Sequence, residues 1–171
     1  MRSAAKPKSA AGARKPRSIA RMAAVQALYQ MDLAGTDVME VIDQFVKLRF
    51  GHGGIDQDGE NDGTLADADP AYFADILNGV VRRQRDIDPL VDHQLRTGWT
   101  LVRVDSILRA ILRAGVFELL ERADVPARVT INEYINVAHA FFDGEESKVV
   151  NGVLDRIAHR LREDEFKTEE G

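Results

Sequence analysis

Apolar side chains recur every three or four residues along most of this chain, a spacing typical of helices that bury one face. The clearest repeats follow Pro16 and Pro70, and no segment shows the alternation of a convincing strand. We therefore expect an all-α fold with about seven helices. The expected helices cover residues 17–35, 38–50, 70–80, 89–95, 101–120, 130–142 and 149–161.

Local signals mark the ends of several of these helices. The pairs Asp69–Pro70 and Asp88–Pro89 each join a capping carboxylate to a proline, which is favoured in the first turn. Gly35 closes the first helix. Thr130 and Glu133 have the spacing of a capping box, so we expect them to begin the next-to-last helix.

The tripeptide Asn-Gly-Val occurs twice inside expected helices, at residues 78–80 and 151–153. Glycine in a helix interior costs about 1 kcal/mol relative to alanine. That cost is tolerated where two helix backbones approach closely. We therefore expect two tight helix crossings, one in each of two packed bundles.

Residues 51–69 hold five glycines and six acidic side chains with almost nothing to bury, which predicts a mobile surface loop. Its acids imitate a calcium loop that begins at Asp56. However, Asn61 stands at the sixth place, where that loop needs glycine, and Asp67 replaces the bidentate glutamate of the twelfth. The four histidines lie in separate segments without ligand spacing. We therefore expect no metal ion.

Charge divides the chain into a basic beginning and an acidic remainder. Residues 1–31 carry seven Lys/Arg and no acid, whereas the remaining 16 Lys/Arg and all 28 Asp/Glu follow. A basic arm of this kind is suited to phosphate, because each cation that pairs with a phosphate releases a counterion. We expect a disordered basic arm over 1–16, one domain over 17–162 and a charged, frayed tail over 163–171.

No motif for catalysis is found. The chain has no cysteine, no phosphate-binding glycine loop, no dinucleotide fingerprint and no serine-hydrolase or zinc-protease motif. Among the acids beside apolar faces, Glu118 is expected to pair with Arg122 or Arg113. We therefore expect a protein that is not an enzyme and needs no cofactor. With no run of 18 apolar residues, a cytoplasmic location without membrane contact fits best.

Five blocks of sequence, in order, resemble the NusB family of bacterial transcription antitermination proteins. They are residues 20–29, 72–80, 111–119, 124–133 and 150–155, and the resemblance spans 17 to about 162. It implies two packed three-helix bundles. It also implies binding to the boxA element of ribosomal RNA leader transcripts as a heterodimer with the ribosomal protein NusE, which joins other Nus factors on RNA polymerase.

The resemblance also implies site residues. The RNA face would comprise basic and neighbouring side chains near both ends of the domain, with two acids at its border; these are Arg14, Lys15, Arg17, Arg21, Lys148, Val149, Glu145 and Glu146. Tyr29 and Arg113 fall on the partner side or its supporting core. Val149 stands where the family usually has phenylalanine, and Tyr134 replaces a small residue. Single-stranded RNA suits such a face, because its unstacked bases are open to side chains.

Two other functions stay open from the sequence. NusB-like modules also precede the catalytic domain of ribosomal RNA cytosine methyltransferases, and a helical scaffold that binds only protein would have a similar pattern. The sequence also does not decide between a monomer and a homodimer that covers the RNA face.

Overall fold

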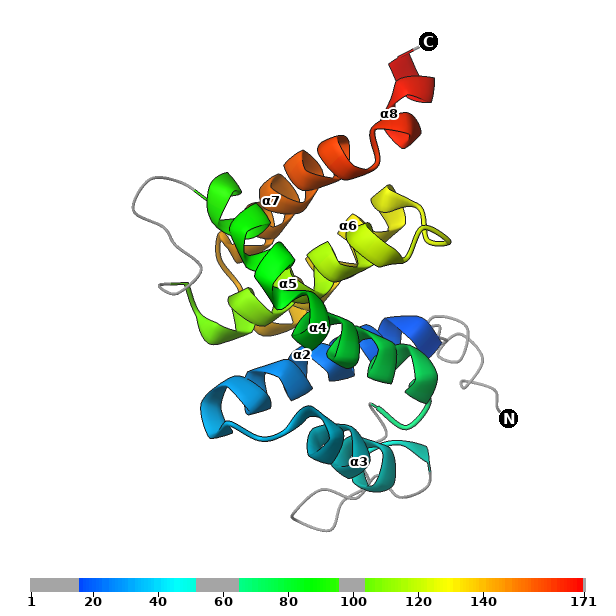
Figure 1. The fold of residues 1–171 in the computed structure, drawn as a ribbon, viewed down its shortest axis with the longest axis vertical. Helices are drawn as coiled ribbons and strands as arrows, with labels where there is room; N and C mark the ends of the chain where they lie inside the picture. Colours follow the sequence, from blue (N-terminus) through cyan, green and yellow to red (C-terminus); the bar gives the residue numbers. More distant parts are fainter. Residues whose placement is uncertain (1–15, 52–64, 96–103, 171) are drawn as a thin grey trace, which may run out of the picture.

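The computed structural model describes residues 16–51, 65–95 and 104–170, and within these ranges it contains seven helices and no strand. The helices, shown in Figure 1, are α2 (Pro16–Ala34), α3 (Val38–Leu48), α4 (Pro70–Gln94), α5 (Ser106–Glu121), α6 (Ala127–Phe141), α7 (Glu146–Leu161) and α8 (Glu163–Glu170). The expected all-α class is confirmed.

The helices pack as two bundles of three. Helices α2, α3 and α4 contact one another, and α5, α6 and α7 do the same (Figure 1). The bundles are joined because α4 and α2 both lie along α5. None of the helices in the described ranges combines the length and apolar character needed to span a membrane.

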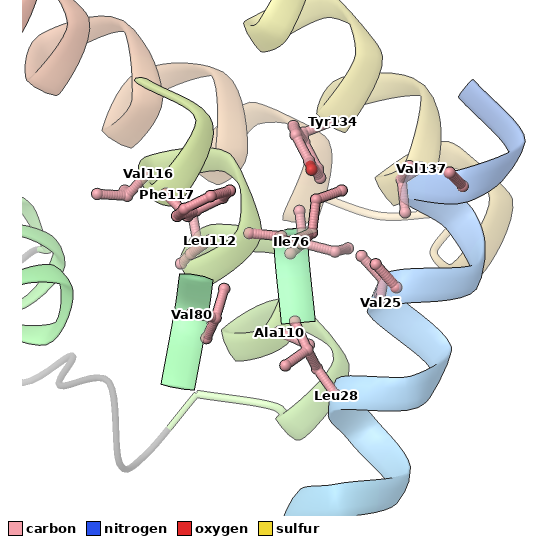
Figure 2. Close-up of a cluster of buried hydrophobic side chains, with 14 of the residues drawn as sticks. Val25, Leu28, Ile76, Val80, Ala110, Leu112, Val116, Phe117, Tyr134 and Val137 are labelled. Atoms are coloured by element: carbon pink, nitrogen blue, oxygen red, sulfur yellow. The ribbon is translucent and has the colours of Figure 1, made fainter. Parts of the chain in front are cut away.

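One core runs through both bundles. In Figure 2, Val25 from α2, Ile76 from α4, Phe117 from α5 and Tyr134 from α6 converge on the same interior. Each of these four side chains is fully buried. Because the apolar faces of four helices meet there, each bundle completes the other's core.

Two predicted helix ends are confirmed. Gly35 ends α2 with φ at +64°, a left-handed conformation that favours glycine, and its N–H donates to the carbonyl of Met31 at 2.8 Å. Asp69 caps α4 through Oδ1, which accepts from the N–H of Tyr72 at 3.0 Å, and Pro70 occupies the first turn.

The predicted break at Asp88–Pro89 is wrong, since α4 continues through Pro89 to Gln94. Asp88 does not cap a helix because its carboxylate accepts two hydrogen bonds from Arg113 of α5, both at 2.9 Å. Pro89 itself is exposed. The expected start of the next helix at residue 101 lies outside the described residues, and α5 begins at Ser106 with Asp105 as its cap.

The predicted capping box at Thr130 is also wrong. Helix α6 begins three residues earlier, at Ala127, and Thr130 is buried in its first turns. The N–H of Ala127 donates instead to Glu165 of α8 at 2.8 Å. Glu133 is directed to α2, where it accepts a hydrogen bond from Ser18. A carboxylate that is distant in sequence therefore caps this helix.

The C-terminal residues from Glu163 form α8 rather than the expected frayed tail. Phe166 is 9% exposed, and its ring stacks on His159 of α7 with centroids 3.9 Å apart. Burial alone would raise the pKa of the Glu165 carboxyl, but the N–H of Ala127 and the guanidinium of Arg162 lower it below its ordinary value. Packing and capping thus hold α8 against the second bundle.

Arg162 secures the C-terminal end of α5. Its guanidinium donates to four backbone carbonyls, those of Glu118, Leu119, Arg122 and Val125, at 2.9 to 3.1 Å. A cation at this place adds a charged donor to carbonyls at and just beyond the end of α5 and favours the negative end of the helix dipole.

Replacing Arg162 with alanine is expected to lower the free energy of unfolding by about 1–2 kcal/mol, because these carbonyls lose a charged donor. Urea denaturation followed by circular dichroism measures the change. Arg162→Lys is the matched control: it keeps the charge but loses the planar fork, so most of the loss should remain. Wild-type stability in Arg162→Ala would contradict the capping role.

Two residues near the C-terminal end of the acidic glycine-rich segment are buried. Leu65 and Ala68 are buried, and the N–H of Gly51 donates to the carbonyl of Ala66 at 2.7 Å. The expectation of almost nothing to bury is therefore wrong at Leu65 and Ala68. Its central part, 52–64, lies outside the described residues, together with the calcium-like acids up to Asp62.

Only one of the two Asn-Gly-Val tripeptides marks a helix crossing. A Cβ at Gly79 would lie 2.0 Å from Cε1 of Phe117, so α4 and α5 approach closely there. At Gly152 the nearest atom is Nη1 of Arg156 on the same helix, 3.2 Å away. The crossing in the second bundle occurs instead at Gly115, where a Cβ would lie 2.8 Å from Leu154.

Candidate nucleic-acid interface

Arg21, expected on the RNA face, lies instead in the core between the bundles, so its expected exposure is wrong. It is 3% exposed. Its Nε and Nη2 donate to the two carboxylate oxygens of Glu118 at 2.7 and 2.9 Å, and Nη1 donates to Glu133 at 2.8 Å. Helices α5 and α6 cover this part of α2, so the guanidinium is not available to RNA.

Two tyrosines complete this cluster. Tyr134 donates to Glu118 Oε2 at 2.5 Å, and Tyr72 donates to Oε1 of the same carboxylate. Burial, followed by the negative charge of Glu118, raises the pKa of Tyr134 well above its ordinary value, so the hydroxyl stays protonated. Arg21, Tyr72, Glu118, Glu133 and Tyr134 are named here the Arg21 network.

The Arg21 network joins α2, α4, α5 and α6 and hence both bundles. The expected pairing of Glu118 with Arg122 or Arg113 is wrong, because its oxygens are used within the network. Two carboxylates share one guanidinium, so the cluster supplies no positive surface. Its role is to hold the bundles in register through hydrogen bonds that leave little freedom of packing.

Arg17 is on the surface, one turn before Arg21. Its side chain is 45% exposed, pairs with Asp124 at 3.3 Å, and lies with its guanidinium carbon 4.6 Å from the ring centroid of Tyr72. Asp124 is shared with Arg122, at 3.0 Å. Burial alone would raise the pKa of the Asp124 carboxyl, but these two arginines lower that pKa below its ordinary value. Arg17 is therefore held at the root of the basic arm, whose Arg14 and Lys15 lie outside the described residues.

The second predicted group lies at the start of α7. Lys148 is 77% exposed and pairs with Glu145 at 3.5 Å. Val149 is half-buried against the core, and Glu146 is half-buried in the first turn. A surface hollow here, named the Lys148 hollow, is lined by Gln94, Leu95, Glu145, Lys148, Val149, Gly152, Val153 and Arg156.

The three cations expected on one face are therefore not brought together. Arg21 is buried, and Arg17 lines a different hollow from Lys148, beside the acids Asp69 and Asp124. Of these three cations, Arg17 and Lys148 are exposed, and they line different hollows.

The two residues expected on the partner side lie in the first bundle and at its contact with α5. Tyr29 is half-buried on α2. Arg113 is held by Asp88 with its side chain 16% exposed, and it lines a hollow with Met31, Asp32 and Val81. A hollow that combines charged groups with apolar side chains can receive a protein helix or loop that carries both.

Arg156 and Gln94 are polar residues of the Lys148 hollow that the sequence analysis did not assign to the site. Arg156 follows Val149 by seven residues, a spacing that places both on one face of α7, so periodicity could have identified it. Gln94 gave no such signal, because only the packing of α4 beside α7 brings it there.

Comparison with known proteins gives a consistent family. Residues 18–159 match the model of the NusB family. The transcription antitermination protein NusB of Rhodopseudomonas palustris is 51% identical over 150 residues, 88% of this chain and 83% of that protein. The protein of the same name from Allorhizobium ampelinum is 54% identical over 146 residues, 85% of this chain and 88% of that protein.

Solved structures agree. The structure of T. maritima NusB matches with a TM-score of 0.70 and 26% identity over 90% of this chain and 99% of that chain. A crystal structure of antitermination factors NusB and NusE in complex with dsRNA also matches, with a TM-score of 0.67 and 25% identity. The match covers 85% of this chain and 97% of the chain in that structure. The chain therefore belongs to the NusB family.

Proposed function

We propose that this chain is a cytoplasmic transcription antitermination factor that binds boxA RNA of ribosomal RNA leaders together with NusE, and so supports processive transcription by RNA polymerase. The observation that carries the proposal is about 50% identity to proteins named for antitermination over most of their length. The likeness to a NusB–NusE complex with RNA supports it further. No catalytic step is required.

The residues proposed to contact RNA are those of the implied RNA face without the buried Arg21. They are Arg14, Lys15 and Arg17 at the arm, and Lys148 and Val149 at the Lys148 hollow, with Glu145 and Glu146 at its border. Tyr29 and Arg113 are proposed to lie at or support the NusE contact. The exposure of Lys148 and Arg17 supports this assignment.

Fluorescence anisotropy with labelled RNA tests the proposal. The protein, alone and with its NusE partner, should bind a boxA-containing RNA more tightly than a scrambled RNA of equal length. Equal affinities in both conditions would reject it. Sedimentation at the same concentrations shows whether a homodimer forms and competes with RNA. Intact mass of the native protein tests the methyltransferase alternative, which requires an attached catalytic domain.

Replacing Lys148 with glutamine is expected to weaken RNA binding and to flatten its salt dependence. One lost phosphate contact should reduce the slope of log affinity against log salt by about 0.7 on a single strand. Lys167→Gln is the matched control, since Lys167 is also exposed and paired with glutamate but lies on α8. An equal change in both variants would indicate only a general effect of charge.

A further inference from the structure

Arg156 lies on the face of α7 that carries the proposed RNA contacts Lys148 and Val149. It follows Lys148 and Val149 by eight and seven residues, which is about two helical turns. Together with them it lines the Lys148 hollow. The residue is exposed, so its guanidinium is accessible to a ligand.

The guanidinium of Arg156 is held in one orientation by Gln94. Its Nε donates to the side-chain oxygen of Gln94 and its Nη2 donates to the backbone carbonyl of the same residue, both at 2.9 Å. Two hydrogen bonds from different nitrogens define the plane of the group. When a ligand stacks on this plane, Arg156 loses less conformational entropy than a freely moving arginine side chain would lose.

Gly152 leaves room for this arrangement. A Cβ at that position would lie 3.2 Å from Nη1 of Arg156 and 3.8 Å from Nη2, so the guanidinium lies over the glycine backbone. The half-buried Val149 adds apolar surface to the hollow above the buried Val153, and Lys148 adds a second positive charge at its edge. A flat cation beside apolar side chains is the surface that an unstacked base prefers, while a lysine can meet the adjoining phosphate.

We propose that Arg156, oriented by Gln94, is the stacking platform for one unpaired base of the bound RNA. This inference rests on the proposed function and adds to it the residue that receives a base, as distinct from those that meet the phosphates. Arg156 contacts the ligand, and Gln94 is a positioning residue that acts through it.

A base-removal experiment tests the proposal. The probes are a boxA-containing RNA and an oligouridine of equal length, each intact and with one base removed at successive positions. In the wild-type protein, removal at one position of the boxA RNA should lower affinity by at least about fivefold. Arg156→Ala should lower affinity for intact RNA by a similar factor, and should show no further loss at that position.

Three variants separate stacking from charge and from folding. Arg156→Lys keeps the charge but loses the plane, so it should resemble Arg156→Ala. Val149→Phe added to Arg156→Ala should recover binding, since an aromatic ring in the same hollow also stacks. Gln94→Ala should show a partial loss confined to the same base position. Arg160→Ala is the matched control for lost charge, because Arg160 is exposed one turn further along α7 and does not line the hollow.

The proposal is overturned if Arg156→Lys binds intact RNA as tightly as wild type. It is also overturned if, at every position, removing the base lowers the affinity of Arg156→Ala by the same factor as that of wild type. These outcomes are distinguishable from failure of the proposed function. A wild-type protein that prefers boxA but shows no coupling between Arg156 and a base rejects the stacking platform alone. Coupling on oligouridine without any preference for boxA rejects the antitermination proposal and keeps the platform.

Discussion

Arg21→Ala is expected to lower the free energy of unfolding by about 3–5 kcal/mol, because it leaves the fully buried Glu118 carboxylate without its cation. Arg17→Ala, one turn earlier on α2, should cost less than about 1 kcal/mol, since the Arg17 pair with Asp124 is exposed to solvent. Urea unfolding of both variants measures the difference. Any loss of RNA binding in Arg21→Ala should be no larger than the fraction of that variant that is unfolded, because Arg21 does not contact RNA.

A second substitution tests the reason for this effect. Adding Glu118→Gln to Arg21→Ala removes the uncompensated buried charge and should recover part of the lost stability. If adding Glu118→Gln lowers the free energy of unfolding further instead of recovering part of it, the charge of Glu118 is not the source of the loss. If Arg21→Ala unfolds at the same urea concentration as Arg17→Ala, the Arg21 network contributes nothing.

Gly79→Ala is expected to destabilise the protein by about 2–3 kcal/mol, because the new methyl would lie 2.0 Å from the ring of Phe117. That ring is fully buried at the crossing of α4 and α5, so it cannot turn away without displacing the core. Urea unfolding again provides the measurement.

The second Asn-Gly-Val tripeptide supplies a matched control with the opposite sign. Gly152→Ala adds the same methyl in the same local sequence, but the nearest atom, 3.2 Å away, is at the exposed end of Arg156, which needs to shift by only a few tenths of an ångström. Its stability should therefore rise by up to about 1 kcal/mol, the helix propensity of alanine over glycine. Equal destabilisation by both substitutions would show that local backbone effects, and not the crossing, explain Gly79.

Helices and several of their ends were predictable because their signals are local. The stripe after Pro16, the cap at Asp69 and the glycine at residue 35 depend on residues within one turn. Predictions failed where the expected capping side chain instead accepts hydrogen bonds from a residue distant in sequence. Asp88 binds Arg113 of α5, and Glu133 binds Arg21 of α2, so the local boundaries signalled at Asp88–Pro89 and at Thr130 did not form.

The candidate site shows the same limit more clearly. Arg17 and Arg21 are four residues apart and therefore lie on one face of α2, as the sequence indicates. Their exposures nevertheless differ completely, because the neighbouring helices cover that face at Arg21 and leave it open at Arg17. Periodicity gives the direction of a side chain from its helix axis, but not which neighbour lies there.

By itself the sequence determined the all-α class, the faces that would be buried, the basic arm and the family resemblance, since each is a property of composition or of short-range spacing. The tertiary structure alone decided that Arg21 joins two bundles in the core, that Glu165 caps α6, and that Gln94 orients Arg156. Each of these depends on contacts between residues dozens of positions apart, which form only when the helices pack.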